Sequence, residues 1–455
     1  MLMSFIKQQI PKKSTDLTSV RNYQSKKEIH NKIAIVVFIT ITLLTGPTTT
    51  ANKSTHCEMS TQQEFAQKSA QFAVNLFNFM YHKQPNRNII YSPFSIQTCV
   101  GMARVGATGE TAAELDRGLG LPSHDVTAIA DTFHNILVNY TNSTILKIAN
   151  KIYIMQGYTI LKEFNEIASN KFFSTADSID FSQNSVAANT INKWVESKTN
   201  NLIKDIISPD ALSPDTRAVL VNAIHFKGEW KYQFPKAATR DDDFYLNEVD
   251  SVKVPMMNVK QTFGYGVMPE LDATALEMPY KDSDLSMLVI LPNTRTGLAN
   301  LQEKLKNFDL SQITTKMFPT KVIVKFPKFK AEFDIELNDA LKNLGMGRMF
   351  SKFAEFGKML NSDSDEPLQI SKVVHKAFIE VNEEGTEAAA ATGAIIRRKR
   401  SISIPANEEF HADHPFVYLI RQIIPGDCSS ATITLFWGTI STITAAVSSL
   451  EHDEL

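Results

Sequence analysis

Cysteine is scarce in this sequence, with three residues in 455, namely Cys57, Cys99 and Cys428. So few and so widely spaced cysteines predict neither a disulfide framework nor a cysteine metal site. An excess of one charge is also missing, since 47 Lys and Arg residues face 49 Asp and Glu residues. A balanced chain gives no reason to expect a polyanionic partner such as nucleic acid.

Several enzyme motifs are missing as well. No phosphate-binding loop, dinucleotide fingerprint or Gly-x-Ser-x-Gly turn occurs in the sequence. His411, Asp413 and His414 lie close together, but they lack the i, i+4 spacing of a helical zinc site, so we interpret them as structural. We therefore expect no enzyme activity, no small-molecule substrate, no metal and no cofactor.

No apolar run reaches the ~20 residues that a membrane-spanning helix needs. Residues 33–45 form a shorter apolar run that follows Lys26, Lys27 and Lys32 and precedes a Gly-Pro-Thr stretch, which is typical of a secretory signal. More than thirty residues precede the run, so a signal anchor is the alternative to a cleaved signal. Either one places the rest of the chain in the lumen of the secretory pathway.

The chain closes on His452, Asp453, Glu454 and Leu455, an HDEL signal that a retrieval receptor binds. Together with the signal-like run, it predicts a protein of the endoplasmic reticulum lumen that cycles with the early Golgi, with some secretion. Three N-glycosylation sequons are compatible with this compartment. They begin at Asn52, Asn139 and Asn142.

Apolar residues recur at helical spacing in residues 65–79 and 187–195, which predicts helices there. Short runs at 285–291 and 322–326 predict strands, and 335–344 predicts a further helix that ends at a glycine. Helices dominate the first part of the chain and strands the last part. This order predicts an α+β fold and does not fit regular βαβ alternation.

No long linker rich in Pro, Gly or Ser divides the chain after Cys57. We therefore expect an N-terminal targeting region at 1–57, one domain at 58–440, and a tail at 441–455 that carries the retrieval signal. Cys99 lies in an apolar segment and is expected to be a core residue.

Residues 383–393 read EEGTEAAAATG, and the small side chains in this stretch alternate cleanly in period 2. Such a segment could lie in a loop or enter a sheet as a strand without clashes, which makes it a candidate switch. One face would carry Thr386, Ala388, Ala390 and Thr392, and the other Glu387, Ala389, Ala391 and Gly393.

The same stretch leads into Arg397, Arg398, Lys399 and Arg400. A basic run of this kind is a nuclear address, a nucleic-acid patch, a solvated face or a processing site. The predicted lumenal location removes most support for the nuclear and nucleic-acid readings. Simple processing remains an alternative, although it would release residues 401–455, which include core-like stretches.

Four segments resemble, in order and spacing, the hallmark segments of the serpin family. The resemblance covers roughly residues 58–440 and implies three β-sheets, about nine helices and an exposed reactive loop at about 383–405. The segments are NIIYSPFSI at 88–96, VNAIHFKGEW at 221–230, HKAFIEVNEEGTEAAAATG at 375–393 and FHADHPFVYLI at 410–420.

The resemblance also assigns roles to individual residues. Glu383, Glu384 and Gly385 begin the hinge, which continues to Thr392 and would insert into the main sheet. The family's shutter, a polar cluster beneath the centre of that sheet, and its breach, at the top of the sheet, are matched by five residues. The shutter residues are Ser92, Ser95, Asn222 and His375, and the breach residue is Trp230.

The implied activity is that of a monomeric inhibitor that acts as a suicide substrate. A protease serine would attack the carbonyl of Arg400, the bond to Ser401 would break, and the freed hinge would insert into the sheet. Counting from Gly385, the family's usual spacing instead puts the bond after Lys399.

Cations at the first, second and fourth positions before the bond, here Arg400, Lys399 and Arg397, match the acidic subsites of furin-like proprotein convertases. Among serpins, the chain resembles insect members that combine a furin-type bait, meaning the basic residues before the cleaved bond, with a retrieval tail. Inhibition of trypsin-like proteases is one alternative. A non-inhibitory chaperone of the endoplasmic reticulum is another.

Overall fold

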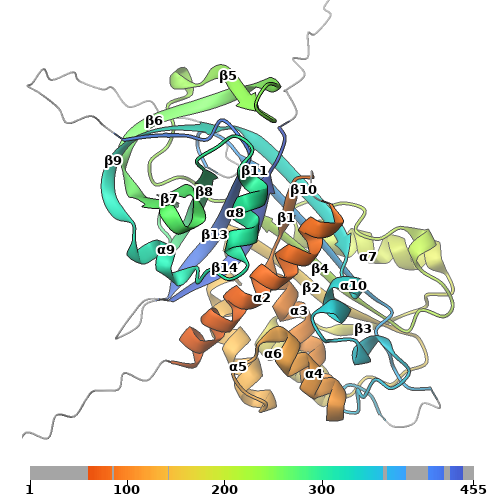
Figure 1. Ribbon diagram of the computed structural model, residues 1–455. Coiled ribbons are helices and arrows are strands. Elements are labelled where there is room, and N and C mark those ends of the chain that lie inside the picture. The colour runs from red at the N-terminus through yellow and green to blue at the C-terminus, as the bar shows by residue number, and fades with distance from the viewer. Residues whose placement is uncertain are drawn as a thin grey trace, which may run out of the picture. The chain divides into compact units, whose positions relative to one another are not determined.

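The computed structural model describes residues 60–84, 87–141, 143–361, 366–385, 408–424 and 431–443 (Figure 1). All described residues belong to one compact unit, Met59–Leu455. Within these ranges, no helix combines the length and the apolar character needed to cross a membrane.

The described residues form nine α-helices and five short 3₁₀ helices. The α-helices are α2 (Thr61–Lys83), α3 (Pro93–Gly106), α4 (Gly109–Leu119), α5 (Val126–Leu137), α6 (Lys162–Phe172), α7 (Asn184–Lys198), α8 (Leu298–Leu305), α9 (Ser311–Thr315) and α10 (Asn338–Asn343). The 3₁₀ helices are η1 (Val138–Tyr140), η2 (Pro209–Ala211), η3 (Lys236–Ala238), η4 (Pro269–Leu271) and η5 (Arg348–Phe350).

Local signals fix the starts of the first two helices. Ser60 caps α2 and forms a capping box with Gln63, which satisfies two amide groups at the helix start. Ser92 caps α3, and Pro93 occupies the first helical position, where its missing N–H costs no hydrogen bond. Every residue of α3 is buried, so this helix lies in the interior of the molecule.

Fourteen strands form two hydrogen-bonded sheets within the described residues. The five-stranded sheet has the order β10 (Phe329–Glu336), β11 (Lys372–Val381), β4 (Ala218–Phe226), β2 (Leu146–Met155) and β3 (Ala176–Ile179). The nine-stranded sheet has the order β1 (Ile89–Tyr91), β14 (Ala431–Ile440), β13 (Phe416–Ile424), β8 (Leu285–Pro292), β7 (Ala273–Pro279), β6 (Ser251–Met268), β9 (Phe318–Pro327) and β12 (Glu408–His411), with β5 (Arg240–Tyr245) paired to β6.

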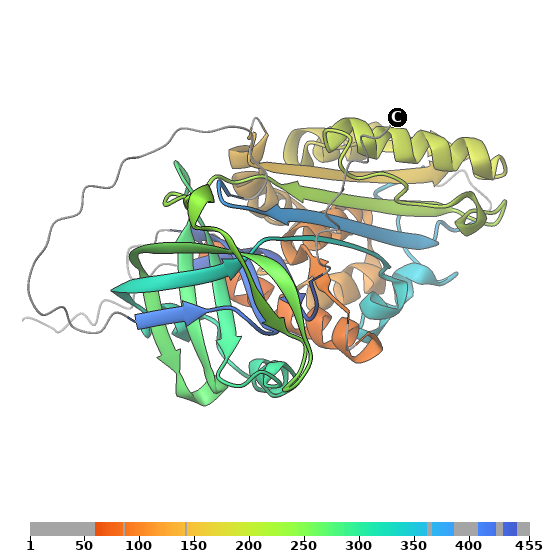
Figure 2. The same ribbon diagram turned by 90° about the horizontal axis from the view of Figure 1, so that it is seen from above.

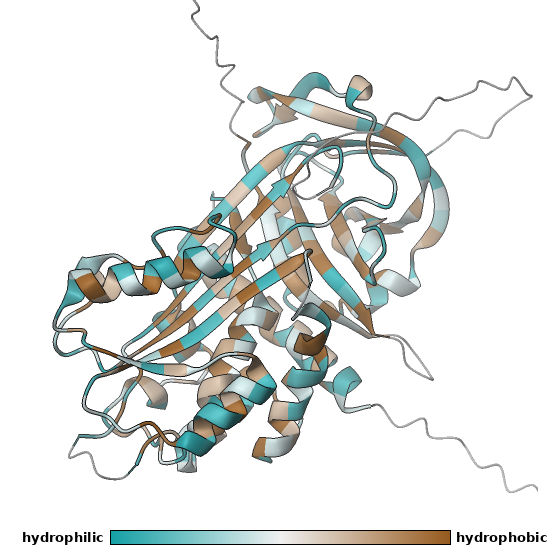
Figure 3. Ribbon diagram, turned by 180° about the vertical axis from the view of Figure 1, so that it is seen from behind, coloured by the Kyte–Doolittle hydropathy of each residue, from teal (hydrophilic) through white to brown (hydrophobic). Residues whose placement is uncertain are grey.

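Both faces of the five-stranded sheet are covered. Figure 2 shows α7 along one face and the early helices on the other. All nine residues of β4 are buried, and alternate residues enter different clusters. Leu220 and Ile224 belong to the large core that includes α3, whereas Val221 and Ala223 pack with Ile191 of α7. In Figure 3, α7 carries both hydrophilic and hydrophobic residues, as expected of a helix with one buried face.

The nine-stranded sheet is continuous because β6 is 18 residues long and strongly curved (Figure 1). Its first part pairs with β5, its middle with β9 and its end with β7. A Cβ atom on Gly266 would lie 2.5 Å from the carbonyl oxygen of Lys316, so the close approach at this end requires glycine. The family resemblance implied three sheets. The described residues form two, because the long strand β6 pairs with β5, β9 and β7 within one nine-stranded sheet.

The expected α+β fold is confirmed. The helices expected around 65–79 and 187–195 are α2 and α7, and the strands expected at 285–291 and 322–326 lie in β8 and β9. The helix expected at 335–344 is wrong at its start, because Ile335 belongs to β10 and pairs with β11, and α10 begins at Asn338. The hydrogen bonds of the β10–β11 pair determine the conformation of Ile335, although the apolar residues that follow recur at helical spacing. Gly345 follows the helix with φ +84°, the left-handed conformation expected of a helix end.

Candidate functional site

The centre of the five-stranded sheet contains a parallel strand pair. β4 and β11 run side by side from Val219 opposite Lys372 to Phe226 opposite Ile379. A parallel pair is slightly less stable per residue than an antiparallel pair. A strand that entered between β4 and β11 in the opposite direction would form antiparallel ladders with both.

A buried polar cluster bridges this pair on the side of α3. Asn222 of β4 and His375 of β11 lie opposite each other in register, and His375 Nδ1 hydrogen-bonds Asn222 Oδ1. The backbone N–H of Ser92 donates to His375 Nε2 at 3.3 Å, which places the ring proton on Nδ1. Asn222 Nδ2 donates to the carbonyl of Ser95 at 3.0 Å and also to Asn150 Oδ1. The Asn222–His375 bond must break when the two strands separate.

Burial keeps His375 neutral. It lowers the pKa of the imidazole from 6.5 to about 3, and the hydrogen bond with Asn222 opposes the shift only in part. At neutral pH the ring therefore acts as one donor and one acceptor, and both positions are used.

At the end of β11, Trp230 holds the segment that we call the stem, residues 382–385. The Trp230 indole N–H donates to the carbonyl of Asn382 at 3.0 Å, and its backbone N–H donates to the carbonyl of Glu384 at 2.8 Å. The backbone N–H of Phe234 donates to the carbonyl of Glu383 at 2.8 Å. The indole stacks on Tyr280 with ring centres 4.6 Å apart. These bonds hold the stem against residues 230–234.

Two ion pairs also hold the stem at this end of the sheet. Glu383 Oε2 lies 2.9 Å from Lys328 Nζ, and Thr239 Oγ1 donates to Glu383 Oε1 at 2.8 Å. Burial acts to raise the pKa of Glu383, but the hydrogen bonds from Lys328, the backbone and Thr239 outweigh it, and the pKa is lowered. Glu384 pairs with Lys236 at 2.5 Å.

Gly385 ends the stem, and no other residue fits there. Its φ is +156°, and a Cβ atom would lie 2.0 Å from the carbonyl oxygen of Gly228. Asn382 Oδ1 accepts hydrogen bonds from the backbone N–H groups of Glu384 and Gly385, which forms a tight turn. Glycine at this position therefore allows the stem to lie directly against the backbone of Gly228 and Glu229.

Several expected site residues lie outside the described residues, and β12 begins the next described part of the chain at Glu408. Asn139 lies on η1, and its side chain is exposed. The expected residues outside the described part are Thr386, Glu387, Ala388, Ala389, Ala390, Ala391, Thr392, Arg397, Arg398, Lys399, Arg400, Ser401, Asn52, Asn142, His452, Asp453, Glu454 and Leu455, together with the apolar run at 33–45.

His411, Asp413 and His414 make structural contacts next to β12. His414 Nδ1 lies 2.7 Å from Asp413 Oδ1, and His414 Nε2 lies 2.9 Å from the carbonyl oxygen of Pro292. His411 Nε2 lies 3.6 Å from Asp242 Oδ2. Among the described residues, no group of three or more His, Cys, Asp or Glu side chains is arranged to hold a metal ion.

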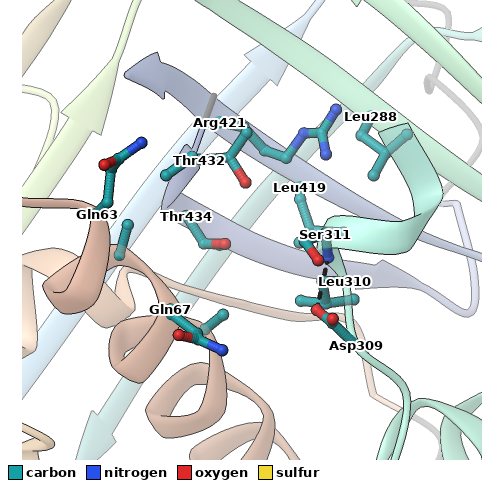
Figure 4. Close-up of a pocket in the computed structure, with 13 residues that line it drawn as sticks. Gln63, Gln67, Leu288, Asp309, Leu310, Ser311, Leu419, Arg421, Thr432 and Thr434 are labelled. Atoms are coloured by element: carbon teal, nitrogen blue, oxygen red, sulfur yellow. Dashed lines mark hydrogen bonds between the residues drawn. The ribbon is translucent and has the colours of Figure 1, made fainter. Parts of the chain in front are cut away.

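A separate pocket of about 190 Å³ lies between α2, the start of α9 and strands β13 and β14 (Figure 4). Arg421 and Asp309 are the charged residues of its lining, and the Arg421 guanidinium contacts Glu277 at 2.5 Å and Thr314 at 3.2 Å. The pocket therefore offers a mixed polar and apolar lining with charged groups of both signs. Neither β4 nor β11 lines this pocket, so it lies apart from the site described above.

Several residues of the site were not expected from the sequence, among them Asn150, Lys236, Thr239 and Lys328. Asn150 lies in strand β2, which also carries Lys147 and Lys151, so its polar side chain gave no clear signal in the sequence. Lys236, Thr239 and Lys328 are ordinary surface residue types in sequence. Their role depends on contacts with the distant stem.

Comparison with known proteins agrees with this geometry. The family model described as serpin (serine protease inhibitor) matches residues 67–441. The chain is 37% identical to antichymotrypsin-2 of Bombyx mori over 352 residues, which is 77% of this chain and 92% of that protein. It is 36% identical to antitrypsin of Bombyx mori over 351 residues, or 77% and 89% of the two chains. The solved structure of cleaved Serpin 42Da matches with TM-score 0.75 and 53% identity over 85% of this chain and all of that chain.

Proposed function

The chain belongs to the serpin family and is a serine protease inhibitor, and we propose that it traps furin-like proprotein convertases in the secretory pathway. The observation that carries the proposal is the sequence between β11 and β12. There, Arg397, Arg398, Lys399 and Arg400 follow a hinge of small residues.

Trapping begins as an ordinary proteolytic step. The serine hydroxyl of the protease attacks the carbonyl of Arg400, the bond to Ser401 breaks, and the new amino group of Ser401 leaves with the proton. Arg400 is then held to the protease as an ester. Water would complete hydrolysis unless the protease is distorted first.

Insertion supplies that distortion. Once the loop is cut, residues from Thr386 onward can enter between β4 and β11, where they replace one parallel ladder by two antiparallel ladders. The hydrogen bond between Asn222 and His375 opens to admit them. Because the protease is attached to the far end of the inserted segment, it is dragged along the sheet, and its active site is deformed.

The bait favours a convertase over a generic trypsin-like protease. One basic residue in the primary pocket satisfies trypsin-like enzymes, which remain the alternative target class. Acidic subsites that also bind Lys399 and Arg397 gain discrimination of about 1–3 kcal/mol for each desolvated charge pair.

The targeting signals support a location where convertases act. Retrieval by a receptor that binds His452–Leu455 would keep the inhibitor in the endoplasmic reticulum, with some secretion. Exposure of Asn139 is compatible with glycosylation there, and Asn52 and Asn142 are further candidates. We propose that the inhibitor acts as a monomer.

One experiment separates the possible functions. Purified full-length protein is incubated with a furin-type convertase and, separately, with trypsin, and a denaturing gel is read for a covalent complex. We expect a complex with the convertase, its loss in Arg400→Ala, and a released fragment whose mass begins at Ser401. Two fragments without a complex would indicate simple processing, and no cleavage at all would favour the chaperone.

A further inference from the structure

An exposed apolar patch lies where the nine-stranded sheet meets the second end of the reactive loop. Phe318 of β9 and Val267 of β6 are 66% and 55% exposed. Phe318 lies opposite Tyr265 in the β6–β9 ladder, and Val267 follows two residues after Tyr265, so the three side chains share one face. We call these three residues the apolar patch.

The patch adjoins the point at which the chain returns from the reactive loop. Tyr265 Oη lies 3.5 Å from a carboxylate oxygen of Glu408, the first residue of β12. β12 runs parallel to β9, with Glu408 opposite Val322. The N-terminal end of β9, which carries Phe318, therefore lies on the side from which the loop enters β12.

Chain length brings the target protease close to this end. Glu408 lies eight positions after Arg400, and an extended chain of eight steps spans at most about 29 Å. Gly385 lies fifteen positions before Arg400, so the other base of the loop can lie almost twice as far away. A protease domain of about 250 residues has a radius of gyration of about 18 Å, so its body is large enough to reach from Arg400 to the nearer base.

We infer that the apolar patch is a docking surface for the catalytic domain of the target protease, on the side of the loop that follows the cleaved bond. Its expected counterpart is an apolar or aromatic rim beside the protease active site. A single exposed apolar side chain needs no explanation, but Phe318 and Val267 adjoin one another beside the loop that the protease must bind. The inference rests on the protease-inhibitor function and does not depend on which protease is trapped.

The test compares the rate of encounter with the efficiency of insertion. The second-order rate constant for covalent complex formation is measured for wild type, Phe318→Thr and Val267→Thr with a furin-type convertase and with trypsin. Each variant removes apolar contact and keeps a residue suited to a strand. Loss of one well-packed contact should slow association about 3–10-fold with at least one protease. The number of inhibitor molecules consumed per trapped protease should stay unchanged, because insertion follows acylation.

Phe353→Thr is the matched control. Phe353 is 61% exposed and follows η5, which contacts α4, and Figure 1 shows α4 far from β9. The inference is overturned if the patch variants associate as fast as wild type, or if Phe353→Thr slows association equally. It is also overturned if the patch variants instead raise the number of inhibitors consumed. Failure of wild type to trap either protease would overturn the inhibitor function itself, and the inference with it.

Discussion

The ion pair between Glu383 and Lys328 holds the stem at the end of β11, and reversing the charge of Glu383 tests that role. The Glu383 side chain is 8% exposed and lies 2.9 Å from Lys328 Nζ. Lys328 sits between β9 and β10, so the pair ties the end of β11 to its outer neighbour in the sheet. Glu383→Lys would place two ammonium groups at this end and release the stem.

The expected cost follows from the unequal burial of the two partners. Removing one partner of a buried pair costs about 3–5 kcal/mol, whereas exposed pairs contribute about 0–1 kcal/mol. Lys328 is 37% exposed and can turn toward water, but Glu383 cannot. We therefore expect Glu383→Lys to cost about 2–4 kcal/mol, and Glu383→Gln, which keeps an acceptor for Thr239, about 1 kcal/mol.

The pH dependence of this pair has a definite sign. A carboxyl whose pKa is lower in the folded state stabilises the fold above its unfolded pKa, near 4.5, and loses that contribution as the pH falls through the folded value. Wild type should therefore lose the contribution only in acid. Glu383→Gln carries no titrating group at this position and should lack that step.

The assay is unfolding in guanidinium followed by tryptophan fluorescence, with size-exclusion chromatography after mild heating. With the stem released, β4 and β11 should separate more readily and then expose strand edges to a strand from another molecule, so Glu383→Lys should also form oligomers. Lys328→Glu alone should destabilise in the same direction, and the exchange Glu383→Lys with Lys328→Glu should recover most of the loss. An exchange that remains as unstable as the single reversal would show that the pair does not hold the stem.

Two further predictions concern the sheet and the inserted segment. The pKa of His375 is lowered to about 3, so the unfolded chain binds a proton first as the pH falls below 6.5. Wild type should lose up to about 2 kcal/mol between pH 6.5 and pH 5, measured by guanidinium unfolding, whereas His375→Asn should be less stable at pH 7 but nearly flat over this range. Thr386→Arg or Ala388→Asp should convert the inhibitor into a cleaved substrate, because a large or charged residue slows insertion relative to hydrolysis. Undiminished covalent complex on a denaturing gel would contradict this.

The parts of the fold that the sequence predicted are those set by strong local periodicity. α2 and α7 are long and amphipathic, and β8 is an apolar run with one serine that ends at a proline, so each pattern is decided within its own segment. The start of the helix predicted at 335–344 was wrong because Ile335 takes its conformation from pairing with β11, far along the chain, whereas α10 lies within the predicted range. The length and pairing of β6 were likewise not predictable from the sequence, because its partners β5, β7 and β9 are set by tertiary contacts.

The candidate site likewise contains residues that the sequence predicted and residues that it did not. The structure brings together Ser92, Ser95, Asn222 and His375, which the family resemblance grouped, because their segments are recognisable motifs. Lys328 offered no such signal. A lysine between two strands is ordinary until the fold places Glu383 beside it. Ionic contacts between distant segments depend on tertiary structure, whereas an alternation of small residues predicts a possible strand from the local sequence alone.

The alternation of the hinge also bears on which bond the protease cuts. A sheet repeats every two residues, so an extra residue within the alternating stretch would exchange its two faces, whereas one placed after Thr392 changes only the length of the loop. The alternation is unbroken up to Thr392. If the cleaved bond is Arg400–Ser401, the one residue by which the loop exceeds the family's usual spacing therefore lies after Thr392, nearer the basic run at 397–400. Insertion therefore tolerates either bond, and the subsites of the protease decide. With Arg400 in the primary pocket, Lys399 and Arg397 fill the second and fourth subsites. With Lys399 there, the fourth subsite would receive Ile396, and one charge contact would be lost.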